Sequence, residues 1–176
     1  MEGESHPNPW SREAFLEELT LPQSRTFVAL EKTPAPKRVH RGSPPFCPLS
    51  TSPGLFFEQI VGYLCFWCVV DELQILNVTV AASHRRKGIG RRLLHHALNY
   101  GVQKGARMAV LEVRKTNRAA QGLYEEAGFR TVGERPGYYS SGQEPALLMH
   151  RDLDENSMFP EGHTLQEEDD THVRHT

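Results

Sequence analysis

Two side chains in the middle of the chain, Glu112 and Tyr124, could move protons. A carboxylate can accept a proton from an attacking group, and a phenol, which is protonated at neutral pH, can donate one to a leaving group. Each side chain also has a purely structural interpretation. Glu112 could be a surface glutamate that pairs with Arg114 or with a neighbouring strand, and Tyr124 could be a half-buried aromatic that packs with Leu123 and Phe129. The residue types alone leave both interpretations open.

A basic turn with two glycines, at residues 85–92, is a candidate anion site. It opens a segment with helical periodicity, so its backbone N–H groups would lack intrahelical partners and would lie at the positive end of a helix dipole. Gly88 and Gly90 would let an anion approach the backbone closely. The bases of the turn are Arg85, Arg86, Lys87, Arg91 and Arg92. The pattern predicts a phosphate site that is neither a Walker motif nor a dinucleotide fingerprint, and a solvated basic helix start is the alternative.

The cysteines and histidines do not form a metal motif. Cys65 and Cys68 are three residues apart in a segment that reads as a strand, so their thiols would point to opposite faces and could neither share a zinc ion nor form a disulfide. Together with Cys47 they are an odd number in a chain without an export signal, which favours reduced thiols. His95 and His96 are adjacent on a predicted helix and would point about 100° apart. The sequence therefore predicts no metal site.

Composition limits the class of protein. The chain has 176 residues, of which 24% are charged and 38% hydrophobic, and this fits one globular domain of ordinary size. Residues 154–176 hold seven acidic residues and one basic residue, a net charge of −6, which leaves +4 for residues 1–153. A mildly basic body suits a small polyanionic ligand but lacks the bias of a nucleic-acid binder, and the longest apolar run is too short to cross a membrane. Because the chain starts with acidic residues and not with a signal peptide, we expect a cytoplasmic protein.

The first part of the chain predicts a helix, a strand and an insertion. Ser11 is suited to cap a helix that ends at Leu19, and residues 25–31 read as a strand. Residues 32–54 hold six of the twelve prolines and are interpreted as a loop insertion within one domain. The apolar face of the helix would consist of Phe15, Leu16 and Leu19.

After the insertion, strand and helix patterns alternate. Residues 58–70 and 72–81 read as the strands of a hairpin that turns near Asp71. The periodicity then predicts, in order, a helix at 89–104, a strand at 107–114, a helix at 117–127 stopped by Gly128, and strands at 129–134 and 145–153. This order is typical of a mixed α/β sheet.

Two stretches resemble the cofactor motifs of the GNAT superfamily of N-acetyltransferases. The motif Arg85-x-x-Gly88-x-Gly90 after a Val-Thr-Val strand is similar to the family's acetyl-CoA pyrophosphate motif, and residues 117–129 (NRAAQGLYEEAGF) are similar to its second cofactor motif. Both occur in the family's order and spacing. Within the superfamily the chain is most similar to the RimI type, the ribosomal-protein-alanine N-acetyltransferases. The segments that carry this similarity include 9–11 (PWS), 25–31 (RTFVALE), 60–67 (IVGYLCFW), 75–78 (ILNV) and 111–114 (LEVR).

The resemblance implies a GNAT acyl-CoA N-acyltransferase fold and an enzyme that uses acetyl-CoA and no metal. It implies that Glu112 is the general base, acting through a water molecule, and that Tyr124 is the general acid for the departing thiolate. The backbone of strand 78–80 would lie along the pantetheine arm. Asn117 would contact the cofactor, although it would also be satisfied as a helix N-cap. The expected cofactor-binding residues are Val78, Thr79, Val80, Arg85, Arg86, Lys87, Gly88, Ile89, Gly90, Arg91 and Asn117.

The resemblance also sets expectations for the rest of the chain. Tyr138 and Tyr139, in the loop at 135–143, would line the acceptor groove, with an exposed turn as the alternative. The strand and helix that usually begin a RimI-type chain would be missing, because only eight residues precede Pro9. The expected divisions are a disordered start at 1–8, a domain at 9–153 with the insertion 32–54, and a disordered acidic tail at 154–176.

The function predicted from these features is N-terminal protein acetylation. The expected acceptor is the N-terminal alanine of a small-subunit ribosomal protein, with neither nucleic acid nor membrane as a direct partner, and the protein would be a monomer or a weak homodimer. Two alternatives remain: a GNAT enzyme that acetylates a small amine or another protein terminus, and a non-catalytic acyl-CoA binder. The presence of Glu112 and Tyr124 argues against the second alternative, and the missing first strand argues for it.

Overall fold

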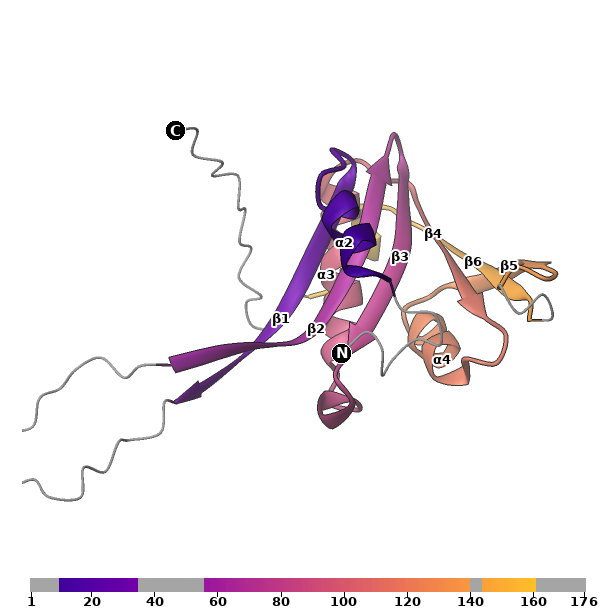
Figure 1. Ribbon diagram of the computed structural model, residues 1–176. Helices are drawn as coiled ribbons and strands as arrows, with labels where there is room; N and C mark the ends of the chain where they lie inside the picture. Colours follow the sequence, from indigo (N-terminus) through magenta and orange to yellow (C-terminus); the bar gives the residue numbers. More distant parts are fainter. Residues whose placement is uncertain (1–9, 35–55, 140–143, 161–176) are drawn as a thin grey trace, which may run out of the picture.

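Within the part of the chain that the computed structural model describes, residues 10–34, 56–139 and 144–160, six strands form one mixed sheet (Figure 1). The order of the strands is β1-β2-β3-β4-β6-β5, and neighbours are antiparallel except for β3 and β4, which run parallel. The predicted mixed α/β fold is confirmed. The strands are β1 (Ser24–Pro34), β2 (Phe56–Val69), β3 (Glu72–Val80), β4 (Met108–Arg114), β5 (Arg130–Arg135) and β6 (Ala146–Asp152).

Helices lie on both faces of the sheet. Figure 1 shows α2 (Arg12–Glu18) on one face of the sheet and α3 (Ile89–Gln103) on the other, and α4 (Arg118–Glu126) follows β4. The core forms between α3 and the sheet because α3 presents an apolar stripe at helical spacing. No helix in the described residues is both long enough and apolar enough to cross a membrane. The largest fully buried side chains include Leu64, Phe66, Leu73, Leu93, Leu94, Leu98 and Met149.

The strands β3 and β4 are paired over only part of their length. Their parallel register joins residues 72–75 to residues 108–111 and ends at Ile75 and Leu111. Beyond that point each strand continues without pairing to the other, so the sheet opens between residues 76–80 and residues 112–114. This gap places the second half of β3 where its backbone can meet a ligand.

A bulge beside the gap reverses the side-chain alternation of β3. The register between β2 and β3 skips Leu76, which inserts one extra residue into β3. Leu73 and Ile75 lie in the core before the bulge, and Val78 and Val80 pack against the same core after it. Val78 and Val80 therefore face the side of the sheet that α3 covers.

β1 and β2 form a two-stranded ribbon that extends beyond the rest of the sheet (Figure 1). The register continues to the pair Pro34 and Phe56, and Lys32 forms an ion pair with Glu58 at 3.1 Å. The prediction that residues 32–34 belong to a loop insertion is therefore wrong, because these residues pair with residues 56–58 of β2 and continue β1. Residues 35–54 of the predicted insertion lie outside the described residues.

The helix α2 begins and ends where the sequence predicts, but its predicted apolar face is wrong. Ser11 caps the helix through its side chain. Phe15 packs edge-on against Tyr63 of β2 at 5.3 Å between ring centroids, whereas Leu16 is 50% exposed and Leu19 is 62% exposed. A helix of seven residues contacts the sheet along a narrow line, so only part of the predicted face is covered.

The chain after β6 packs back onto α3. The ring of Phe159 stacks on His95 with 3.5 Å between centroids. Asn99 Nδ2 donates to the carbonyl oxygen of Phe159 at 2.9 Å, and the amide of Phe159 donates to Asn99 Oδ1 at 2.8 Å. The prediction of a disordered tail is therefore wrong for residues 154–160, because their backbone finds partners on a buried asparagine. The expected disorder of 1–8 and of 161–176, and the expected lack of a strand and helix before Pro9, concern segments outside the described residues.

Candidate active site

A cavity of about 600 Å³ lies where β3, α3 and α4 meet. The end of β3 and the turn before α3 form one wall, and α4 forms the other. Its volume is in the range of sites that hold small ligands and cofactors. The residues predicted to bind a cofactor line this cavity, apart from Lys87: they are Val78, Thr79, Val80, Arg85, Arg86, Gly88, Ile89, Gly90, Arg91 and Asn117.

The start of α3 points its backbone toward this cavity. Gly88 is the N-cap residue and has the left-handed φ of 77° that glycine adopts readily. Among the helices of the described chain, α2 and α4 have side-chain caps, whereas α3 has none. The N–H groups of its first turn are therefore suited to an anion. A Cβ built at Gly90 would lie 3.5 Å from Leu123 on α4, an ordinary contact distance, so α3 and α4 approach each other closely at this residue.

The basic residues of the turn surround the same cavity. The Arg85 Nε donates to the carbonyl oxygen of Val80 at 3.2 Å, which ties this side chain to the end of β3. Arg86 and Arg91 are exposed and line the cavity. Lys87 is exposed and does not line it. The arrangement joins a positive helix end with guanidinium groups, as a diphosphate site requires.

The start of α4 forms the opposite wall. Asn117 Oδ1 accepts from the amide of Ala120 at 3.1 Å, so Asn117 is the N-cap that the sequence predicts and also lines the cavity. The next residue, Arg118, lines the cavity as well, and its Nη1 donates to Gln121 Oε1 at 2.9 Å.

Tyr124 lies at the inner end of α4, lines the cavity and is only 7% exposed. Burial raises the pKa of its phenol well above the ordinary value, and Tyr139 raises it further. The hydroxyl therefore stays protonated at neutral pH. The ring also packs near Phe129, with 5.9 Å between centroids, as the structural interpretation expects.

Glu112 lies on β4 at the edge of the gap and does not line the cavity. Its neighbours Leu111 and Val113 belong to the core, so the glutamate is on the other face of the sheet. Arg135 Nη1 lies 2.9 Å from Glu112 Oε1. A hydrogen bond to Glu112 raises the pKa of the Tyr138 phenol. The structure thus separates Glu112 from the cavity that Tyr124 lines.

One residue connects these two sites. Tyr139 is half-buried, and burial raises the pKa of its phenol, with a further increase from the charge of Glu112 and a decrease from Arg114. Tyr139 in turn raises the pKa of the Tyr124 phenol. Glu112 and Tyr124 therefore both interact electrostatically with Tyr139, although Tyr124 belongs to the core and Glu112 is on the other face of the sheet.

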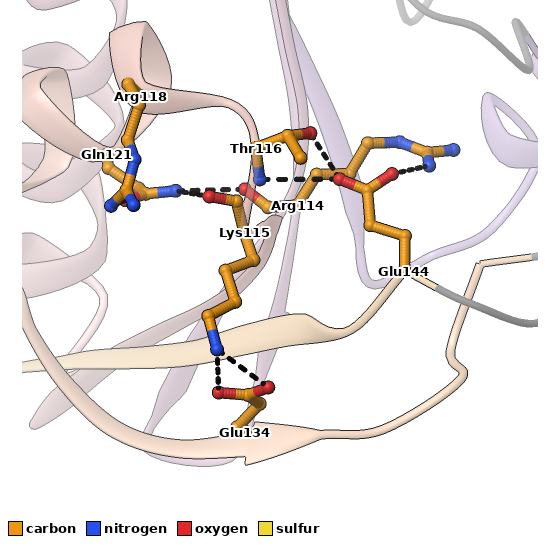
Figure 2. A network of polar contacts seen from close by, with 7 residues as sticks. All are labelled: Arg114, Lys115, Thr116, Arg118, Gln121, Glu134 and Glu144. Atoms are coloured by element: carbon orange, nitrogen blue, oxygen red, sulfur yellow. Dashed lines mark hydrogen bonds and ion pairs between the residues drawn. The ribbon is translucent and has the colours of Figure 1, made fainter.

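The end of β4 is held by a polar network, which Figure 2 shows. Arg114 pairs with Glu144, with 2.7 Å between Nη1 and Oε2, and not with Glu112 as one interpretation of the sequence expected. Lys115 pairs with Glu134 of β5 at 2.9 Å. Gln121 Nε2 donates to the carbonyl oxygens of residues 114 and 115, at 3.0 and 2.9 Å. The network fixes the point at which β4 turns into α4.

Several residues of the site were not predicted from the sequence. His84 and Arg118 line the cavity and stand beside predicted motif residues, so their position next to Arg85 and Asn117 was a usable signal. Arg135 and Glu144 are different. Their partners are far away in the sequence, and no local pattern indicates the pairs.

Cys65 and Cys68 do not contact each other. Cys65 Sγ lies 3.2 Å from Thr26 Oγ1, whereas Cys68 packs against the core on the side of α3. Over residues 10–34, 56–139 and 144–160, no group of three or more histidine, cysteine, aspartate or glutamate side chains is placed to hold a metal ion.

Known proteins resemble this chain in sequence. The family described as "Acetyltransferase (GNAT) family" matches residues 1–129. A Bacillus subtilis (strain 168) protein with the provisional name [ribosomal protein bS18]-alanine N-acetyltransferase is 29% identical over 149 residues, which are 85% of this chain and 83% of the relative. The [ribosomal protein bS18]-alanine N-acetyltransferase of Escherichia coli (strain K12) is 39% identical over 83 residues, which are 46% of this chain and 56% of the relative.

A solved structure agrees with these matches. The crystal structure of the ribosomal-protein-S18-alanine N-acetyltransferase from Escherichia coli superposes with a TM-score of 0.63 and 25% identity, over 90% of this chain and 88% of that one. Since the family match covers well over half of the chain, it shows membership. The chain is an acetyltransferase of the GNAT family.

Proposed function

We propose that the protein uses acetyl-CoA to acetylate the N-terminal alanine of a small-subunit ribosomal protein, with bS18 as the first candidate. Two relatives carry this activity in their names, and one of them is similar over 85% of this chain. The proposed place of action is the cytoplasm, where ribosomal proteins meet the ribosome. The observation that carries the proposal is the cavity, because it joins a basic helix start at one end to the buried Tyr124 at the other.

The cavity residues suit the parts of a coenzyme thioester. The first turn of α3 and Arg86 and Arg91 would bind the diphosphate. The pairing of β3 with β4 ends at Ile75, so the backbone of residues 78–80 lies beside the gap and would hydrogen-bond the pantetheine arm as an added strand does. Asn117 would contact the same arm from α4. Acetyl-CoA supplies a thioester carbonyl that an amine can attack.

The two faces of the sheet support different roles in the transfer. Tyr124 lines the cavity from which the thioester would arrive, and Glu112 lies on the other face, from which an acceptor would enter the gap. Glu112 would take a proton from the α-amine through water, the amine nitrogen would bond to the acetyl carbon, and the carbon–sulfur bond would break. Tyr124, whose pKa is raised by burial, would give its proton to the departing sulfur.

A turnover experiment tests the proposal. The full chain is incubated with acetyl-CoA and, in separate arms, a peptide with a free N-terminal alanine, the same peptide with a blocked α-amine and an internal lysine, and a small amine. We expect transfer to the first peptide only. Transfer to the small amine alone would show that the acceptor is a small amine and not a protein terminus. Binding of acetyl-CoA in calorimetry without any transfer would refute catalysis.

Variants test the role of the carboxylate. Glu112→Gln should lower kcat/KM at least a hundredfold, because a general base contributes about 10²- to 10⁴-fold. Glu125→Gln is the matched control, since Glu125 is an exposed glutamate of α4. An unchanged kcat/KM in Glu112→Gln would remove Glu112 from the mechanism.

A further inference from the structure

The carboxylate of Glu144 links the segment before β6 to the end of β4, in addition to a backbone hydrogen bond from Lys115 to Pro145 at 3.2 Å. Glu144 Oε2 lies 2.7 Å from Arg114 Nη1, and Glu144 Oε1 accepts from the amide of Thr116 at 3.3 Å and from the Thr116 hydroxyl (Figure 2). Both oxygens of the carboxylate are therefore used. The loop and the β4–α4 junction are held together at the residue that precedes the Asn117 cap.

The same carboxylate reaches an aromatic ring through Arg114. The guanidinium carbon of Arg114 lies 3.7 Å from the centroid of the Tyr139 ring, within the range of a cation–π contact. The amide of Tyr139 also donates to the carbonyl oxygen of Glu144, at 3.4 Å. Glu144 thus contacts Tyr139 directly through the backbone and indirectly through the guanidinium.

The contact is sheltered from water. The side chains of Arg114 and Glu144 are 16% and 21% exposed, whereas those of the neighbouring pair Lys115 and Glu134 are 49% and 40% exposed. An ion pair that is exposed to solvent fixes the positions of its two side chains only weakly, whereas a partly buried pair with additional hydrogen bonds fixes them more firmly. The hydroxyl of Thr116 and then Arg114 lower the pKa of Glu144, so the carboxylate is ionised at neutral pH.

The Tyr139 ring lies against the guanidinium of Arg114, which is on the same strand as Glu112, and the charge of Glu112 raises the pKa of the Tyr139 phenol. It also packs edge-on against Tyr138, with 5.1 Å between centroids, and Tyr138 hydrogen-bonds Glu112. A shift of Tyr139 would therefore also disturb Tyr138, the aromatic side chain that contacts Glu112.

We propose that Glu144 is a positioning residue for the acceptor: its carboxylate holds the Arg114 guanidinium over the Tyr139 ring and so fixes the aromatic wall beside Glu112. This inference rests on the proposed function, because it assigns the wall to acceptor binding. The residue does not touch the reacting atoms. It acts through Arg114 and Tyr139.

The experiment compares three variants of the full chain. Glu144→Gln removes the charge that holds Arg114. Thr116→Val removes one hydroxyl contact of Glu144 and leaves the pair with Arg114. Glu134→Gln breaks the exposed pair with Lys115 in the same network and serves as the matched control. For each, kcat and the acceptor KM are measured with the alanine-initiated peptide, the Kd of acetyl-CoA by calorimetry, and the Tm by scanning.

We expect the acceptor KM of Glu144→Gln to rise about tenfold, with kcat within about threefold and the Kd of acetyl-CoA within about twofold of wild type. Glu134→Gln should stay close to wild type in every measurement, and Thr116→Val should raise the acceptor KM less than Glu144→Gln does, because the pair with Arg114 remains. A purely structural role would instead lower the Tm and weaken acetyl-CoA binding without a selective change in KM. That result, or an equal KM increase in Thr116→Val, would overturn the proposal.

A spectroscopic measurement separates this inference from the proposed function. In protein with ¹³C-labelled tyrosine, Glu144→Gln should shift the ring signals of Tyr139 and Tyr124, and Glu134→Gln should not. If wild type fails to acetylate the peptide, the proposed acceptor is wrong, and the tyrosine signals then decide whether Glu144 positions Tyr139. Unshifted signals in Glu144→Gln refute the positioning role whatever the acceptor is.

Discussion

Replacing Tyr124 with phenylalanine should separate catalysis from folding. The substitution removes one oxygen and keeps the ring, which is 7% exposed and lies 5.9 Å from the Phe129 ring. The packing is unchanged, so the free energy of unfolding should change by no more than about 1 kcal/mol. In the proposed mechanism the substitution removes the proton donor for the departing thiolate, so kcat should fall by about 10²- to 10⁴-fold, which corresponds to a barrier higher by about 3 to 5 kcal/mol.

The assay follows the free thiol of released CoA at saturating acetyl-CoA and peptide, together with the Tm of each protein. Tyr100→Phe is the matched control, because Tyr100 is an aromatic of α3 that contacts Phe27 and Phe66 and does not line the cavity. Its kcat should equal that of wild type. If Tyr124→Phe loses less than about threefold in kcat, or if Tyr100→Phe loses as much as Tyr124→Phe does, Tyr124 is not the general acid.

Three further outcomes are expected. Gly88→Ala should lower the free energy of unfolding by about 1 to 2 kcal/mol and weaken acetyl-CoA binding in calorimetry, because alanine is strained at the φ of 77° that this residue adopts. The new Cβ itself has room, since its nearest neighbour is Arg91 at 3.9 Å. Unchanged stability and affinity would contradict this prediction. Asn99→Ala should lower the free energy of unfolding in urea by about 1 to 3 kcal/mol, since two hydrogen bonds to Phe159 are lost, and an unshifted midpoint would argue against that docking. Burial raises the pKa of Tyr124, so above pH 10 the phenol ionises in the unfolded chain while it stays protonated in the folded one. The free energy of unfolding should therefore keep the full contribution of Tyr124 below pH 10 and fall by about 1 kcal/mol per pH unit above it. Urea midpoints between pH 9 and 11 should therefore fall more steeply for wild type than for Tyr124→Phe.

Local features of the site could be predicted from the sequence. Gly88 and Asn117 are the N-cap residues of α3 and α4. An N-cap is defined by the helix that begins directly after it, so both could be predicted from the local sequence. The strands were predictable because their segments are rich in apolar, aromatic and β-branched residues. The bulge at Leu76 was not, since it appears only when β2 is aligned beside β3.

Features that depend on distant partners could not be predicted. Glu112 could be assigned to β4, but its partner Arg135 lies on another strand that folding brings close. The docking of Phe159 on His95 was hidden by the acidic composition of the residues around it, which predicts disorder when it is considered alone. In both cases the contact joins two segments that are far apart in the sequence, and no local pattern indicates that they meet.

The pairing of Pro34 with Phe56 has a practical consequence. The two positions are paired across the ribbon, and the entropic cost of closing a connection between them grows only slowly with its length. A fluorescent protein or an affinity tag grafted between these two positions should therefore leave acetyl transfer intact. The ribbon offers a place to attach a reporter or to immobilise the enzyme.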